Sequence, residues 1–284
     1  MICFLNKAIK KEREDNLMNK KKFSEFYFEG DRNYPDSVYW ELYNKNPQEA
    51  ISKYEGHMYC PLCRKAPITV AKGNERRYLK VDRTDMEKHD IDCSYRLEEG
   101  NKKETSDFYQ DLDKTDIKNR LVSCMNRMLK EVKAAKVNAT PKFSTHVSRE
   151  KEFLNFTTSS SKKKYLPHKN FTIGTLSDDL DVQKIFYGKC SLYIVQYIPN
   201  GENEIKMYYL KVLHRESKKQ ICDISISTHV YEYLKADFED IPTNKEEAKD
   251  YYLCFSGIME TSKYTYKCKL MDSRLIVVEE DISK

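Results

Sequence analysis

Two pairs of metal-ligand side chains constrain this chain more than any other feature of its sequence. Cys60 and Cys63 stand three positions apart in MYCPLCRKAP, and His89 and Cys93 form a second close pair after 25 intervening residues. A zinc site needs four such donors at about 2.0–2.3 Å from one ion, and a Cys-x2-Cys turn supplies two of them. The stretch TVAKGNERRYLKV between the pairs predicts a hairpin that turns at residues 72–74 and brings them together. The sequence therefore predicts a zinc ion bound by Cys60, Cys63, His89 and Cys93.

Alternatives for these side chains stay open. Cys60 and Cys63 could be a redox pair or plain thiols, although redox pairs of this spacing accompany a βαβ pattern that is not visible here. His57, three residues before Cys60, is an alternative ligand. Four protein ligands leave no open position for an activated water, so we expect the zinc to be structural and to stabilise a module with a small core.

The order of these motifs along the chain also resembles that of a known class of zinc-binding segment. A CP-x-C turn, a basic hairpin, and then a histidine and a cysteine are similar to zinc-ribbon segments at the front of some bacterial competence and nuclease-associated proteins. Four ligands alone assign no family.

Composition places the chain among folded proteins. Of its 284 residues, 39% are hydrophobic and 33% are charged, which predicts one or two domains with buried cores rather than disorder. No apolar run approaches the roughly 18–20 residues of a membrane span, and the opening MICFLNKAIKK is not a secretory signal. Nine cysteines without framework spacing indicate a reducing compartment. We therefore expect a cytoplasmic protein that does not enter a membrane.

Changes in composition divide the chain into four regions. Residues 1–22 are a basic extension, in which Met18 is an alternative start. Residues 23–137 combine the zinc-binding module with an amphipathic basic helix, and residues 138–175 form a linker or irregular arm. Residues 176–284 form a barrel domain. Within the module, Asn46 caps a short helix that has Pro47 at its first position and Glu49 in a capping box. The apolar face of the longer helix consists of Ile117, Leu121, Met125, Met128, Leu129 and Val132.

Strand patterns dominate the last third of the sequence. Segments rich in β-branched and aromatic residues predict strands, and a helix that Thr228 caps follows the third of them. The predicted strands span residues 184–198, 204–215, 219–227, 251–260 and 264–280. The resulting α+β chain ends in a β-β-β-α-β-β order that resembles the OB-fold, a small five-stranded barrel. SH3-like barrels and other small β+α domains remain alternatives.

No catalytic signature is visible in the sequence. Nucleophile elbows, glycine-rich phosphate loops and H-E-x-x-H are absent. The triplet Glu131-Val132-Lys133 has the E-x-K form of some nucleases but lies in the amphipathic helix, and Asp178, Asp179 and Asp181 precede the first barrel strand. We therefore expect a protein that is not an enzyme. The alternative is an enzyme whose active site has no recognisable sequence signature.

Two classes of function fit these features. The first is a zinc-containing nucleic-acid-binding protein, which would bind single-stranded DNA or RNA by gripping phosphates and stacking bases on barrel aromatics. The second is a protein-interaction or scaffold subunit, which a net charge of only +5 favours. The residues predicted to contact nucleic acid are Arg64, Lys65, Lys72, Arg76, Arg77 and Lys80 in the module and Lys206, Tyr208, Lys211 and Arg215 in the barrel. Other barrel tyrosines that could stack on bases are Tyr187, Tyr193, Tyr197 and Tyr209.

Overall fold

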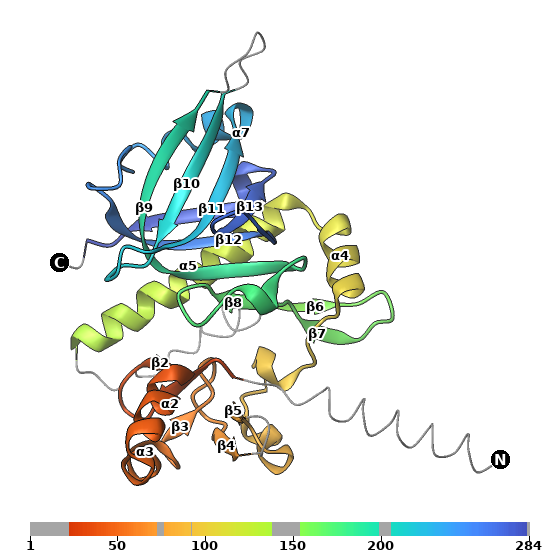
Figure 1. Cartoon of the computed structure of the whole chain (residues 1–284). Helices are drawn as coiled ribbons and strands as arrows, with labels where there is room; N and C mark the ends of the chain where they lie inside the picture. The colour runs from red at the N-terminus through yellow and green to blue at the C-terminus, as the bar shows by residue number, and fades with distance from the viewer. Residues whose placement is uncertain (1–22, 73–76, 92, 138–153, 199–205, 283–284) are drawn as a thin grey trace, which may run out of the picture. The chain divides into compact units, whose positions relative to one another are not determined.

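The computed structural model describes residues 23–72, 77–91, 93–137, 154–198 and 206–282 (Figure 1). The chain divides into two compact units, Met1–Arg96 and Leu97–Lys284. The predicted basic extension at residues 1–22 and the candidate Arg76 lie outside the described residues.

The first unit combines a small antiparallel sheet with two helices and a hairpin. The sheet has the strand order β2-β1-β3. Asn46 Oδ1 accepts the Glu49 N–H at 3.3 Å and Pro47 is the first helical residue, so the predicted cap of α3 is confirmed. β4 and β5 form the predicted antiparallel hairpin. The elements are β1 Glu25–Phe28, β2 Asn33–Pro35, α2 Asp36–Lys45, α3 Pro47–Tyr54, β3 Met58–Tyr59, β4 Thr69–Lys72, β5 Arg77–Lys80 and the 3-10 turns η1 Arg83–Lys88 and η2 Ser94–Arg96.

The core of the first unit is small and rich in aromatic side chains. Phe26, Tyr39, Met58 and Leu79 are fully buried. Three cysteines, Cys60, Cys63 and Cys93, belong to the same cluster of buried residues. The cysteine side chains therefore lie against the core of this unit rather than on a detached loop.

The second unit begins with two helices and three short strands and ends with a set of long strands. The predicted helix–strand order after residue 183 is present, although the single strand predicted over residues 264–280 is two strands separated by a 3-10 turn. The elements are α4 Lys102–Asp111, α5 Lys114–Val137, β6 Asn155–Thr157, β7 Lys163–Tyr165, β8 His168–Asn170, η3 Ser177–Asp179, β9 Gln183–Tyr197, β10 Met207–Leu213, β11 Gln220–Ser227, α7 Thr228–Leu234, β12 Lys249–Thr261, β13 Tyr266–Leu270, η4 Ser273–Leu275 and β14 Ile276–Glu280.

Five of these strands close into a barrel. β9 is long enough to pair with two neighbours, because its first part pairs with β12 and its last part pairs with β10. β10 pairs antiparallel with β11, β11 pairs parallel with β13, and β13 returns antiparallel to β12. The helix α7 connects the third and fourth of these strands, and its cap is Ser227 rather than Thr228, because the Ser227 hydroxyl accepts the Val230 N–H.

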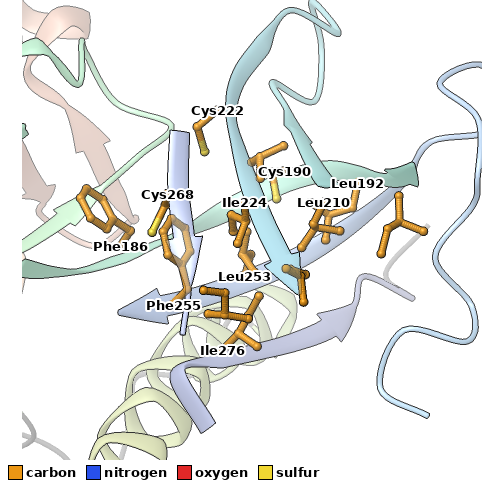
Figure 2. Packing of buried hydrophobic residues seen from close by; sticks show 14 of the residues in the cluster. Phe186, Cys190, Leu192, Leu210, Cys222, Ile224, Leu253, Phe255, Cys268 and Ile276 are labelled. Atoms are coloured by element: carbon orange, nitrogen blue, oxygen red, sulfur yellow. The ribbon is translucent and has the colours of Figure 1, made fainter. Parts of the chain in front are cut away.

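Alternate residues of the barrel strands fill its interior. Figure 2 shows Phe186, Leu253 and Phe255 among the core side chains, and the rings of Phe186 and Phe255 stack with centroids 5.2 Å apart. Val230 and Leu234 of α7 are buried in the same cluster. Successive side chains of a strand point to opposite faces, so the residues that alternate with these core residues along each strand lie on the outer side of the barrel.

The amphipathic helix belongs to a different unit from the one predicted from the sequence. The helix α5 belongs to the second unit, where it contacts β12, β14 and β9, instead of the first unit (Figure 1). The expected apolar face is confirmed at Ile117, Leu121, Met125 and Met128, which are buried. The described part of the expected linker, residues 154–175, contains β6, β7 and β8, and β8 pairs parallel with β9. An apolar helix face needs an apolar partner, and the spacing of a helix does not show which partner it has.

Candidate metal centre and barrel face

The four predicted ligand residues meet in the first unit. The donor atoms of Cys60, Cys63, His89 and Cys93 all lie within 4.8 Å of one another, and all four residues are buried. Cys60 Sγ lies 3.9 Å from Cys93 Sγ, and Cys63 Sγ lies 3.3 Å from His89 Nδ1. Bonds of about 2.0–2.3 Å to a tetrahedral ion place donors roughly 3.5–3.8 Å apart. These side chains are therefore close enough to bind a metal ion.

Backbone hydrogen bonds hold the first ligand pair in a tight turn. The Cys60 N–H donates to Ala66 O at 2.8 Å, and the Arg64 N–H donates to Cys60 O at 2.9 Å. Arg64 adopts a φ of 60°, a left-handed conformation that is uncommon for a residue with a side chain. Its guanidinium lies 4.5 Å from the centroid of the Tyr27 ring, which favours this conformation through a cation–π contact.

The second ligand pair follows a 3-10 turn. The Cys93 N–H donates to Asp90 O at 3.0 Å, which brings Cys93 back toward His89. An ion pair between Lys65 and Asp90 joins the segment after Cys63 to the segment after His89. The two halves of the cluster are thus connected by side chains as well as by the core.

The electrostatics of the cluster favour one thiolate. Hydrogen bonds from Cys60 and Cys93 lower the pKa of Cys63, and its sulfur also accepts the backbone N–H of Ala66. Burial raises the pKa of Cys60. Metal ions bind the thiolate form of cysteine, so metal binding at this cluster must release protons.

His57, the alternative ligand, is not a member of this cluster. Its Nδ1 lies 2.9 Å from Glu29 Oε2, and both side chains are more than half exposed. The structure therefore brings together the four residues chosen from their spacing.

Most basic candidates of the first unit have acidic neighbours. Lys65 pairs with Asp90, Lys72 Nζ lies 2.8 Å from Glu55 Oε1, and Lys80 pairs with Asp82. These pairs offset part of the positive charge that the sequence suggested for phosphate contact. Of the other candidates, Arg64 lies over Tyr27 and Arg77 is exposed.

The barrel candidates separate into inward and outward residues. Tyr208 stacks on Tyr231 with ring centroids 3.6 Å apart and packs against the core, so it does not present its ring for stacking on a base. Tyr187 is also buried. Arg215 Nε donates to Asp250 Oδ2 at 3.2 Å, and Lys206 is exposed. Tyr208 thus lies on the core side of β10, whereas Tyr187, which alternates with the core residue Phe186, lies on the outer side of β9 and is buried there against His168.

Side chains that alternate with the core residues form an outward surface on four barrel strands. One cross-strand row runs from Tyr193 through Lys211 and Asp223 to Lys267. The next row runs from Val195 through Tyr209 and the small, buried Ser225 to Lys269. We call this surface, together with Tyr197 in the following row, the open face; its tyrosines and lysines are Tyr193, Tyr197, Tyr209, Lys211, Lys267 and Lys269.

The open face combines rings with cations. Tyr197 is 54% exposed, and its ring lies edge-on to that of Tyr209 with centroids 6.4 Å apart. Lys211 Nζ lies 5.4 Å from the Tyr209 centroid and 2.8 Å from Asp223 Oδ2. Sequence reasoning missed Lys267 and Lys269, although the alternation in YKCKL around the buried Cys268 is a signal that could have identified them.

Asp179, a member of the acidic cluster before the barrel, forms ion pairs with two lysines. Asp179 is buried, and its carboxylate lies 2.7 Å from Lys184 Nζ and 3.5 Å from Lys169 Nζ. This arrangement stabilises the start of the barrel and leaves Asp179 in a structural role. The side chains of the E-x-K triplet at residues 131–133 lie outside the described residues.

Comparisons with known proteins add no relative. Neither protein-family models, nor curated proteins, nor solved structures include a match to this chain. Across the part of the chain that the structure describes, helices with the length and apolar character of a membrane span are absent.

Proposed function

We propose that this chain is a zinc-containing protein that binds single-stranded DNA or RNA on the open face of its barrel, without catalysing a reaction. The observation that carries the proposal is the alignment of Tyr193, Tyr197 and Tyr209 with Lys211 in adjacent strands. Planar rings accept bases by stacking, and lysines beside them contact phosphates.

The strand order supports an OB-like barrel. The pairing of the third strand β11 with the fifth strand β13 is parallel, and the helix α7 lies between the third and fourth strands. OB-fold barrels bind oligonucleotides on the face of their second and third strands. The open face includes the corresponding strands β10 and β11, so the proposed binding surface lies where OB-fold barrels bind oligonucleotides.

The donor set supports zinc as the metal. Three cysteines and one histidine are a common ligand set of structural zinc sites, and soft thiolate ligands favour zinc over magnesium or calcium. Four protein ligands leave no open coordination position, so the ion would stabilise the first unit and would not activate water. We also propose a reducing cytoplasmic location, because the nine cysteines of the sequence lack framework spacing.

A protein-interaction subunit is the second candidate. The ion pairs of Lys65, Lys72 and Lys80 favour it, because they offset the charge that would attract phosphates to the first unit. A barrel and a closed metal site would serve such a subunit equally well.

Binding of oligonucleotides distinguishes the two candidates. We expect the full chain to bind a fluorescein-labelled oligothymidylate or oligouridylate with an affinity that falls steeply as salt rises. Changing Tyr197 and Tyr209 together to alanine should weaken binding at least tenfold, because base stacking contributes about 1–3 kcal/mol per base. Fluorescence anisotropy measures both effects.

The matched control is Tyr233→Ala, which removes a tyrosine of α7 that is 68% exposed and does not belong to the open face. This variant should bind as the unchanged protein does. Absence of binding at low salt, or equal binding by the double variant and the control, would contradict the proposal and favour a protein partner.

A further inference from the structure

Two cations stand directly opposite each other at the end of the hairpin in the first unit. Lys72 ends β4, Arg77 begins β5, and the two residues form a cross-strand pair. Like charges in such a pair are destabilising, so a protein that retains them needs a compensating contact. The neighbouring pair on the same side of the hairpin is Val70 with the buried Leu79, so the cations lie where the core ends.

The ring of Tyr43 is the contact that the two cations share. Lys72 Nζ lies 5.2 Å from the centroid of this ring, and Arg77 Cζ lies 5.5 Å from it. Tyr43 comes from α2, where it stacks with the buried Tyr39 and meets Trp40 edge-on with centroids 6.1 Å apart. A packed aromatic cluster therefore fixes the position of both positive groups.

Acidic side chains compensate only part of this charge. Glu55 pairs with Lys72 and also accepts a hydrogen bond from Tyr39. Arg77 is exposed and makes no ion pair with any residue that the structure describes. Among the described residues, one carboxylate pairs with Lys72 and none pairs with Arg77, so positive charge remains at this surface beside partly exposed aromatic rings.

We propose that Lys72 and Arg77, held against Tyr43, form a phosphate-contact site through which the first unit binds the backbone of single-stranded nucleic acid. This inference rests on the proposed function, since it names a second contact for the same class of ligand. A phosphodiester offers anionic oxygens to both cations and relieves their repulsion. Contacts of this kind position a strand and do not read its sequence.

The fluorescence emission of the single tryptophan of the chain provides a signal that is specific to this site. Trp40 is the only one among 284 residues, and it lies in contact with Tyr43. Titration of the full chain with unlabelled oligothymidylate should change Trp40 emission, and added salt should reverse the change. An abasic strand of the same length should still change Trp40 emission, because it retains the phosphates while lacking the bases that stack on the open face.

Charge-removing variants test the two cations. Lys72→Gln and Arg77→Gln should each weaken binding about three- to tenfold at moderate salt, and each should lower the salt slope by about one. The matched control is Lys53→Gln, because Lys53 is an exposed lysine of the same unit that lies 5.1 Å from the Tyr54 ring. This variant should bind as the unchanged protein does, and equal zinc content would show that all three variants are folded.

The outcomes separate this inference from the proposed function. Unchanged Trp40 emission with undiminished binding by Lys72→Gln and Arg77→Gln overturns the phosphate site, while a loss in the Tyr197 and Tyr209 double variant still supports the barrel contact. Weaker binding by the charge variants with an unaffected double variant supports the phosphate site and overturns the barrel contact. No binding at low salt overturns both.

Discussion

At the scale of single residues, Asp250 connects three polar groups at a corner of the barrel. Its carboxylate accepts hydrogen bonds from Ser191 Oγ at 2.7 Å and from Arg215 Nε at 3.2 Å. Lys218 Nζ lies 3.7 Å from Asp250 Oδ1. Burial alone raises the pKa of Asp250, but the hydrogen bonds and the charges of Arg215 and Lys218 outweigh burial, so the pKa is lowered.

The lowered pKa of Asp250 predicts a specific pH dependence. A carboxyl whose pKa is lower in the folded state stabilises the fold above its unfolded pKa, and this contribution is lost as pH falls through the folded pKa. Asp250→Asn should therefore reduce the free energy of unfolding by about 1–3 kcal/mol at neutral pH. The difference from the unchanged protein should shrink as the solution becomes acidic.

Urea unfolding of the full chain at several pH values measures this difference. Asp237→Asn, at an exposed position, is the control and should change stability little. A difference that stays constant down to pH values below the ordinary aspartate pKa would show that the ionised carboxylate is not the stabilising group.

The cysteines also differ from one another at this scale. Cys63 and Cys124 are both buried, but only Cys63 lies in the ligand cluster. Cys63→Ser should abolish stoichiometric zinc, because it removes one of four ligands, whereas Cys124→Ala should retain it. Elemental analysis of the purified variants checks the expectation, and a full zinc complement in Cys63→Ser would contradict the assigned ligand set.

At the scale of elements, the apolar spacing of α5 predicts that one face of the helix is buried but does not predict which strands bury it. Its apolar spacing predicted a buried face, and Leu121 and Met125 are indeed buried. The partner of that face is β12 with β14 and β9, the nearest of which begins 46 residues after the end of α5. Helical periodicity is a local property, whereas the choice of partner depends on which distant apolar surface is available.

The packing of α5 on the strands predicts unequal effects of two neighbouring substitutions. Leu121 is fully buried, and Val122 is 38% exposed on the other side of the same helix turn. Leu121→Ala should destabilise the second unit by about 2–5 kcal/mol, because it leaves a cavity in the helix–strand interface. Val122→Ala should change stability by less than about 1 kcal/mol. Denaturant unfolding compares them, and similar losses would argue against this packing.

The tyrosines of the barrel show that local pattern is also insufficient for strands. Tyr208 and Tyr209 are adjacent in sequence, but Tyr208 packs on Tyr231 and Tyr209 points to the open face. Alternation guarantees that two neighbouring residues face opposite sides. It does not show which side is the core when both residues are tyrosines, because either ring could be buried or exposed.

At the scale of the whole molecule, the metal cluster and the barrel belong to different units. The first unit has a small core that includes three of the four candidate ligands, so we expect its folding to depend on a bound metal ion. The barrel has a larger core of its own and no residue in the cluster.

Metal removal should therefore unfold one unit and spare the other. After treatment with a chelator, amide hydrogens of β1, β3 and α3 should exchange rapidly, whereas those of β9, β10 and β12 should stay protected. Hydrogen exchange read by mass spectrometry resolves the two sets. Restoring zinc should restore protection in the first set, and protection that persists there without metal would show that the ion is not needed for folding.

Features that depend on local spacing could be predicted from the amino-acid sequence. The ligand quartet, the cap of α3 and the order of strands around α7 follow from residue types at fixed intervals, because turns, helices and strands impose their own periods on the chain. The folded chain was needed to show which tyrosines face outward, which strands α5 covers and which lysines have acidic partners. Those outcomes depend on contacts between distant segments, and a local pattern is compatible with several of them.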